Sequence, residues 1–215
     1  MDYIIHILPN MIQGLGVSAK IFLFTIVLSL PIGVLLAMVR ISKVGLFRRL
    51  AAMYIYVMRG TPLMLQIMFI YNGLPLMLNI QINDFPAAIL AFVANYAAYF
   101  AEIFRGGIQS ISKGQYEGAK VLGFTYKQTM WHIILPQVVK RVIPPLGNET
   151  ITLLKDTSLV YILAMNDLMR VTRAFVQRDF DTTPFLVAAV FYLLCTAILT
   201  KILAYIEKRY AVYED

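Results

Sequence analysis

"EGAKVLGFTYKQTMWHIILPQ", residues 117–137, decides the fold because it is a polar, lysine-bearing stretch set between strongly apolar ones. Within the wider segment 109–136, two residue pairs fit a capping box, in which a hydroxyl and a glutamine side chain satisfy the first backbone N–H groups of a helix. The pairs are Ser112 with Gln115 and Thr125 with Gln128. Gly123 suits a left-handed helix end. The segment therefore predicts two short helices hinged at Gly123–Phe124.

The same segment carries an apolar stripe at helical spacing. Its members are Ala119, Leu122, Tyr126, Met130 and Ile133. Such a stripe fits an amphipathic helix at the membrane surface, and it fits equally a docking surface for a soluble partner. The pattern alone does not choose between these two interpretations.

The rest of the chain has a membrane composition. It is 60% hydrophobic and 14% charged, whereas about a quarter of the residues of a soluble domain are charged. Uncharged runs approach the roughly 20 residues that a spanning helix needs. We predict one all-α polytopic membrane domain over residues 1–215, with "MDYIIHILPNMIQGLG" (1–16) as a short interfacial segment. Its five spans are expected at about 16–39, 51–78, 85–108, 137–165 and 184–206.

The cations predict the orientation. Most of the 19 lysines and arginines lie in or next to segments 40–49 and 109–136 and the C-terminal end. By the positive-inside rule this side is cytoplasmic, which places the N-terminus outside, the C-terminus inside and the loop 109–136 in the cytoplasm. The net charge of +7 then indicates contact with anionic lipid of the bilayer and not with nucleic acid.

Two predicted spans carry polar faces, and an ionisable residue at the bilayer centre costs about 2.5–3.5 kcal/mol on insertion scales. In the third span the face consists of Asn95, Tyr99 and Glu102. In the fourth it consists of Glu149, Thr152 and Asp156, with Asn148 and Lys155 beside it. Together the faces predict a water-accessible pathway. Alternatively, Glu102 pairs with Arg105 one turn away, while Lys155 and Asp156 reach the outer interface.

Proline and the remaining reactive residues indicate little chemistry. Pro144 and Pro145 are expected to disrupt the fourth span before Glu149. Arg59, before Gly60-Thr61-Pro62, fits a kinked helix with its cation at the interface, and no chemistry is assigned to it. No phosphate-binding loop occurs, and His6, His132 and Cys195 form no catalytic or metal-binding set. The sequence predicts no enzyme and no cofactor in this chain.

The opening segment resembles the "EAA…G…I-LP" loop of the membrane subunits of bacterial ABC importers. The matching residues are Glu117, Ala119, Gly123, Ile134, Leu135 and Pro136, and the family usually has alanine where this chain has Gly118. The resemblance implies that the loop is a coupling helix, which inserts into a groove of a cytoplasmic ATPase subunit. Capped, hinged helices suit such a lever, because caps worth about 1 kcal/mol each keep short helices folded.

Three further stretches are similar to the polar-amino-acid permeases within that group. They are "YVMRGTPLMLQIMFIY" (56–71), "YFAEIFRGGIQSISKGQ" (99–115) and "LGNETITLLKDTSL" (146–159). The resemblance implies a pair of ATPase subunits that bind ATP and Mg, a second permease subunit (identical or a close paralogue), an extracytoplasmic amino-acid-binding protein, and a location in the bacterial inner membrane. It also implies that the third and fourth spans enclose the translocation path.

The substrate prediction leans towards a basic amino acid such as arginine, lysine or histidine. Three intramembrane acids could receive cationic groups, and Lys155 or a backbone N–H could receive the carboxylate. The outer segment 166–183, with Arg170, Arg173 and Arg178, is expected to dock the binding protein. The alternatives are a permease for another small solute such as methionine, a self-sufficient carrier or channel, and a purely structural membrane anchor.

Overall fold

The computed structural model describes residues 2–210, and every element in this range is helical. The helices are α1 (Asp2–Ile41), α2 (Gly45–Gly60), α3 (Leu63–Met68), α4 (Leu74–Leu78), α5 (Asp84–Gln109), α6 (Lys113–Val121), α7 (Tyr126–Gln128), α8 (Leu135–Asp156), α9 (Leu168–Asp179) and α10 (Thr183–Tyr210). Two π-helical turns, η1 (Phe69–Gly73) and η2 (Thr129–Ile134), and one 3-10 segment, η3 (Thr157–Leu163), join some of them. The prediction of an all-helical protein is confirmed for this range.

Three helices among residues 2–210, α1, α5 and α10, are long and apolar enough to cross a membrane. Segments Gly45–Gly60 and Leu63–Leu78 together would make a fourth crossing, but they are bent by 106°. The kink expected at Gly60-Thr61-Pro62 is therefore confirmed, because Pro62 ends the run of backbone hydrogen bonds at this point; whether the bent pair forms the second span over 51–78 stays a prediction. Helix α8 carries charges along its length, and the count of five spans stays a prediction.

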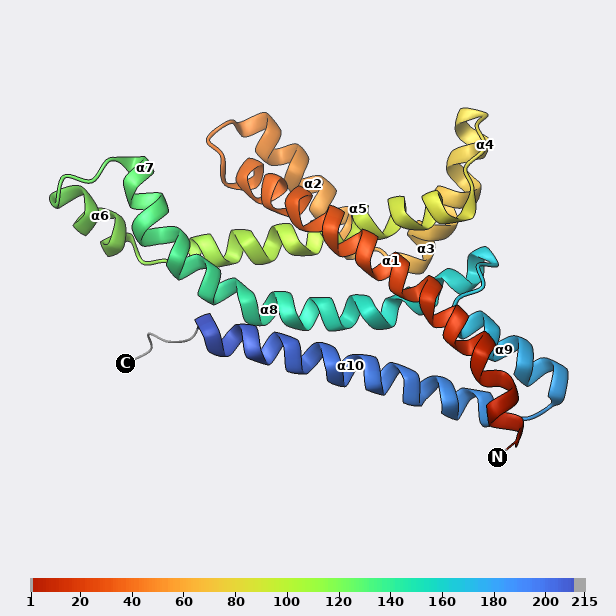
Figure 1. The fold of residues 1–215 in the computed structure, drawn as a ribbon. Helices are drawn as coiled ribbons and strands as arrows, with labels where there is room; N and C mark the ends of the chain where they lie inside the picture. Colours follow the sequence, from red (N-terminus) through yellow and green to blue (C-terminus); the bar gives the residue numbers. More distant parts are fainter. Residues whose placement is uncertain (1, 211–215) are drawn as a thin grey trace.

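The cation-rich segments gather at one end of the molecule (Figure 1). The turn between α1 and α2, helices α6 and α7 and the end of α10 lie at this end, whereas the start of α1, the turn before α5 and α9 lie at the other. This arrangement agrees with the sidedness expected from the positive-inside rule. Which end faces the cytoplasm stays a prediction.

Helix α5 is the centre of the packing. In its most apolar window 61% of the residues are buried, against 6% in α10. Phe92, Tyr96 and Phe100 on α5 are fully buried and pack in one cluster with residues of α1, α3, α8 and η3. The exposed faces of α10 and α2 are left for lipid or a partner.

Small residues let α1 approach α5 closely. Buried positions recur every three or four residues along α1 and end with Ser29, Gly33 and Ala37. A Cβ atom on Gly33 would lie 2.7 Å from the Cβ of Phe100 and 3.3 Å from the backbone N of Ala101. The two backbones can meet here only because residue 33 has no side chain.

Whether the segment 1–16 lies at the membrane interface stays a prediction, but helix α1 begins at Asp2 and runs through this segment without a break. The reason is tertiary: Ile7 and Met11 are fully buried against Leu168 and Phe175 of α9. The hydroxyl of Tyr3 also donates a 2.8 Å hydrogen bond to Asp179 at the end of α9. Packing against α9 therefore extends α1 beyond the membrane-length run.

The start of α9 is a buried polar junction. The carboxylate of Asp167 accepts hydrogen bonds from the backbone N–H groups of Met169 (2.9 Å) and Arg170 (3.1 Å), and so caps the helix. Asp167 has no exposed surface, and burial raises the pKa of its carboxyl to about 6. A Cβ on Gly14 of α1 would lie 2.9 Å from the carbonyl oxygen of Asp167, which again requires glycine.

Candidate functional site

A cavity of about 660 Å³, which we call the acidic cavity, lies between the α2–α3 bend, α5 and the end of α8. It is lined by Arg59, Gly60, Thr61, Pro62, Leu63, Met64, Asn95, Tyr96, Tyr99, Glu149, Thr152, Asp156 and Leu159. Five of the predicted pathway residues are among them: Asn95, Tyr99, Glu149, Thr152 and Asp156. The two polar faces predicted from sequence spacing therefore meet at one cavity.

Helix α8 supplies the acids. Glu149 and Asp156 are seven residues apart, so two turns of helix place both on the face that lines the cavity. Tyr96 of α5 donates a 2.7 Å hydrogen bond from its hydroxyl to Oδ2 of Asp156. Thr152, between the acids, donates to the carbonyl of Asn148 at 3.2 Å. The expected disruption at Pro144 and Pro145 is wrong, since α8 continues through both prolines, with Val142 and Gly147 buried on either side of them.

The bend after α2 brings a cation to the same cavity. The guanidinium carbon of Arg59 lies 5.2 Å from the centre of the Tyr99 ring, within the range of a cation–π contact. Its Nη1 atom lies 3.7 Å from Oε2 of Glu102. Sequence analysis assigned no chemistry to Arg59, because a kinked helix with its cation at the interface explained the residue adequately. Its position depends on the direction of the bend, which no periodicity reveals.

At the bend, side-chain amides donate hydrogen bonds to a backbone carbonyl that has lost its helical donor. Pro62 has no N–H to offer the carbonyl of Met58, four residues earlier. That carbonyl accepts instead from Nε2 of Gln66 (2.9 Å) and from Nδ2 of Asn95 (2.9 Å), and Asn95 also donates to Oε1 of Gln66 at 3.0 Å. The hydroxyl of Thr61 satisfies the carbonyl of Val57 at 2.8 Å. The bend is therefore fixed by a network in which the carbonyls of Val57, Met58 and Thr61 accept from side chains.

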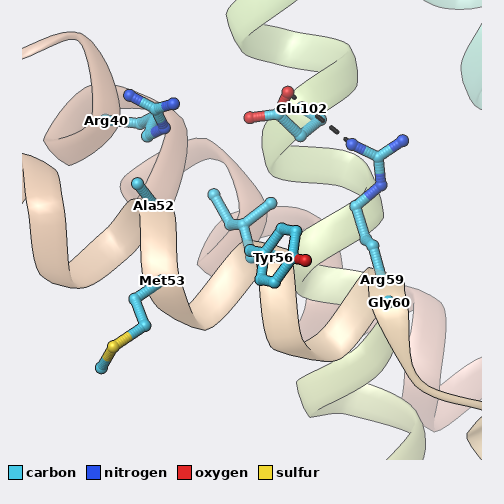
Figure 2. A pocket seen from close by; sticks show the side chains of 8 residues that line it. Arg40, Ala52, Met53, Tyr56, Arg59, Gly60 and Glu102 are labelled. Atoms are coloured by element: carbon cyan, nitrogen blue, oxygen red, sulfur yellow. Dashed lines mark ion pairs between the residues drawn. The ribbon is translucent and has the colours of Figure 1, made fainter.

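Glu102 lies outside the acidic cavity. It lines a second cavity of about 620 Å³, together with Arg40, Ala52, Met53, Ile55, Tyr56, Arg59 and Gly60 (Figure 2). Arg105 holds the Glu102 carboxylate with two hydrogen bonds, of 2.9 Å and 2.6 Å. The alternative that Glu102 pairs with Arg105 one turn away is therefore confirmed.

The two remaining pathway candidates are not brought to the acidic cavity. Asn148 and Lys155 are exposed and are not among its lining residues. The cavity is lined instead by Arg59 and Tyr96, which were not predicted from the sequence as pathway residues. The same helical spacing that identified Asn95 and Tyr99 would have included Tyr96 if a buried hydroxyl had been counted as a candidate partner for Asp156.

Segment 109–136, which is expected to act as a coupling lever and is called the lever below, has the predicted hinge. Gly123 adopts a left-handed φ of +79°, and Thr125 forms the full capping box with Gln128. Ser112 occupies the N-cap position of α6 but makes no side-chain cap bond, so the first expected capping box is wrong. Its glutamine, Gln115, accepts from Gln137 at 3.4 Å instead.

The predicted stripe on the lever divides in two. Ala119 is buried and Met130 and Ile133 pack against a cluster around Ile134 and Val138. By contrast, Leu122 and Tyr126 at the hinge are 75% and 76% exposed. Of the other matched residues, Glu117, Gly118 and Pro136 are exposed and Leu135 is half-buried. The lever therefore has a packed base and an apolar tip that stands free of the rest of the chain.

Residues 2–210 contain no group of three or more His, Cys, Asp or Glu side chains placed to hold a metal ion.

Residues 29–212 match the family described as "Binding-protein-dependent transport system inner membrane component". The arginine transport system permease protein ArtQ of Bacillus subtilis is 37% identical over 206 residues, which cover 94% of this chain and 93% of the relative. The glutamine transport system permease protein GlnP of Escherichia coli is 36% identical over 204 residues, with 94% and 93% coverage.

Solved structures agree with this fold. A crystal structure of an amino acid ABC transporter with histidines matches with a TM-score of 0.90 and 33% identity, over 96% of this chain and 97% of that one. An inward-facing MetNI methionine ABC transporter matches with a TM-score of 0.73 over 95% of both chains, at 17% identity. At that identity the second match speaks for the fold alone.

Proposed function

The chain belongs to the family of inner membrane components of binding-protein-dependent transport systems, as an amino-acid ABC transporter permease, and we propose that its acidic cavity carries a basic amino acid. The matches agree with the sequence-based expectation of a transport subunit rather than an enzyme. They give no support to a self-sufficient carrier or channel. Identity alone does not choose the substrate, because the relatives named for arginine and glutamine are 37% and 36% identical.

The charges that line the acidic cavity carry the substrate proposal. Glu149 and Asp156 face it from α8, and Arg59 faces it from the end of α2. An amino acid presents one ammonium and one carboxylate. Arg59 suits the carboxylate, since a guanidinium can bind it with two parallel hydrogen bonds. One acid then receives the α-ammonium group, and the second is left for a cationic side chain.

Glu149 and Asp156 are half-buried, and a neutral side chain would leave one of them without a counter-charge, which costs free energy. The same argument replaces Lys155 by Arg59 as the receptor of the carboxylate, because Lys155 is exposed and does not line the cavity. The charge of Glu102 is not counted among those available to the substrate, since Arg105 binds its carboxylate with two hydrogen bonds. Two acids against one arginine therefore favour a substrate with a net positive charge.

We propose further that the tip of the lever docks on a cytoplasmic ATPase subunit, which binds ATP and Mg. Val121, Leu122 and Tyr126 leave an apolar surface exposed at the hinge, and the Thr125 capping box keeps the helix behind it folded. The packed base transmits a push directly into α8, because η2 continues into α8 without a break. The acids Glu149 and Asp156 lie on that same helix.

The outer helix α9 is proposed as the contact for the extracytoplasmic binding protein. Its arginines are not equivalent. Arg178 pairs with Asp179 at 2.6 Å, and Arg173 lies over the Tyr161 ring at 4.9 Å. The Nη1 atom of Arg170 is buried and has no hydrogen-bond partner among residues 2–210. A second permease subunit, identical or paralogous, would cover the exposed faces of α2 and α10.

The test is reconstitution with the ATPase and the binding protein in liposomes, followed by uptake of arginine, lysine, histidine and glutamine. We expect ATP-dependent uptake of the basic amino acids. Glu149→Gln and Asp156→Asn should each lower this uptake at least about tenfold, the cost of removing a hydrogen-bonded charge. Glu207→Gln on α10, which lies away from the cavity, is the control. Faster uptake of glutamine than of arginine would refute the basic substrate.

A further inference from the structure

Arg59 lies at the boundary between the two cavities. Among the described residues, Arg59 and Gly60 are the ones that line both the acidic cavity and the second cavity. The second cavity is walled by α2, by Arg40 at the end of α1 and by Glu102. It therefore lies towards the cation-rich end of the molecule (Figures 1 and 2). The two cavities therefore adjoin at Arg59 and Gly60, and a solute that moves directly from one to the other passes the Arg59 side chain.

The contacts of Arg59 are loose. Its Nη1 atom is 3.7 Å from Oε2 of Glu102, which is longer than a hydrogen bond, and its side chain is 42% exposed (Figure 2). Its other neighbour, the Tyr99 ring, belongs to the wall of the acidic cavity. Half-exposed ion pairs without hydrogen bonds contribute little free energy, so the guanidinium can leave Glu102 at low cost.

Glu102 does not depend on Arg59. Arg105 binds both Glu102 oxygens, at 2.9 Å and 2.6 Å. When Arg59 leaves, the carboxylate keeps a partner with better geometry than the one it loses. The pair can therefore break without leaving an unpaired buried charge, which is the usual penalty for opening such a contact.

The base of Arg59 is fixed while its side chain is free. The preceding residue, Met58, is held through its carbonyl by Gln66 and Asn95. The following residue, Gly60, has open space where a Cβ would lie. Movement at this point is therefore a side-chain rotation on a rigid support rather than a shift of α2.

We propose, on the basis of the function proposed above, that Arg59 is a latch between the two cavities. When it pairs with Glu102, the guanidinium closes the acidic cavity towards the second cavity. When the carboxylate of an amino acid enters the acidic cavity, it offers Arg59 two charge-assisted hydrogen bonds and draws the guanidinium away from Glu102. The passage to the second cavity then opens only when the cavity is loaded.

The first test measures access without any ligand. In a Cys195→Ser background, Thr152→Cys reports on the acidic cavity and Tyr56→Cys on the second cavity. A membrane-impermeant thiol reagent is applied to inside-out vesicles that contain the permease with its ATPase. We expect Arg59→Met to speed labelling of the first reporter roughly fivefold, the weight of one weak ion pair. The second reporter should label at an unchanged rate.

Matched variants separate the latch from general loosening. Glu102→Gln should give the same increase as Arg59→Met, and the double variant no more than either single change, because both remove one pair. Arg49→Met, an exposed arginine of the same helix that lines neither cavity, should change nothing. If Arg59→Met fails to assemble, Glu102→Gln still decides the question. Labelling within twofold of the parent in both variants overturns the latch.

The second test examines the carboxylate. Lysine and lysinamide, which lacks the carboxylate, are compared as protectants of Thr152→Cys in the purified permease–ATPase complex. With Arg59 present, lysine should protect at a concentration about tenfold lower than lysinamide, and Arg59→Met should make the two equal. Equal protection in the parent overturns the carboxylate as the trigger. If lysine does not protect at all, the proposed substrate fails, while the ligand-free labelling still decides the latch.

Discussion

Replacing Gly33 by alanine tests the close approach of α1 and α5. The new Cβ would lie 2.7 Å from the Cβ of Phe100 and 3.3 Å from both the N of Ala101 and the O of Ala97. Carbon atoms pack best at about 3.5–4.0 Å, so the helices must separate locally by about 1 Å. Two of these three atoms belong to the backbone, and a rotamer change cannot relieve the clash.

Gly16→Ala on the same helix is the matched control, because a Cβ there meets no atom within 4 Å. Both substitutions gain the same helix propensity, about 0.5–1 kcal/mol, so the difference between them isolates the cost of overpacking. That cost is typically about 1–3 kcal/mol. For a chain of this size, 1 kcal/mol corresponds to about 2–4 °C, and the apparent Tm of Gly33→Ala should lie about 2–12 °C below that of Gly16→Ala.

The assay is thermal loss of the monodisperse, detergent-solubilised complex at one fixed heating rate, since unfolding of such a protein is governed by rate. Gly16→Ala should match or slightly exceed the parent. Equal apparent Tm values for the two variants would contradict the close contact between α1 and α5, and so would a higher value for Gly33→Ala.

Two further predictions follow from the caps. Thr125→Ala should destabilise the lever helix by about 1 kcal/mol, seen as faster hydrogen exchange in α7 and η2, whereas Ser112→Ala should leave α6 almost unchanged because Ser112 makes no side-chain cap bond. Burial raises the pKa of Asp167 to about 6 from 3.8, so the folded state holds a proton that the unfolded state has lost. The stability contributed by this proton is complete below about pH 4 and is lost as the pH rises to about 6, so Tm should fall over this range. Asp167→Asn, which keeps the cap, should remove this fall in Tm. An unchanged fall in Tm would assign the pH dependence to other groups.

The apolar helices could be predicted closely from the sequence. The expected spans 85–108 and 184–206 correspond to α5 (Asp84–Gln109) and α10 (Thr183–Tyr210). Long uncharged runs bounded by polar residues mark such helices directly. The hinge at Gly123 was equally accessible, because the left-handed conformation and the Thr125 cap are both local properties of a few residues.

The start of α1 could not be predicted in the same way. Residues 2–15 are helical because Ile7 and Met11 pack against Phe175 of α9, far away in the sequence. The bend after α2 is a similar case. Pro62 indicates a break, but the sequence does not give the angle of 106°, and the direction of the bend places Arg59 in the lining of both cavities.

A polar residue in an apolar span can satisfy the protein's own backbone or bind a solute, and only the structure separates these two roles. Asn95 was predicted as a pathway residue from its spacing with Tyr99. It does line the acidic cavity, but its hydrogen bonds to Met58 and Gln66 hold the backbone at the bend. Pro62 created the need for them by leaving the Met58 carbonyl without its helical donor.

Glu149 and Arg59 differ from Asn95 in this respect. Among residues 2–210, Arg59 contacts the Glu102 carboxylate and the Tyr99 ring and not a backbone carbonyl, and both Arg59 and Glu149 line the acidic cavity. Desolvating such charges is costly unless something recovers the cost, and a zwitterion with an added cation offers both signs of counter-charge at once. The polar side chains that do not satisfy backbone groups of the fold are therefore the ones available to hold and release a charged solute.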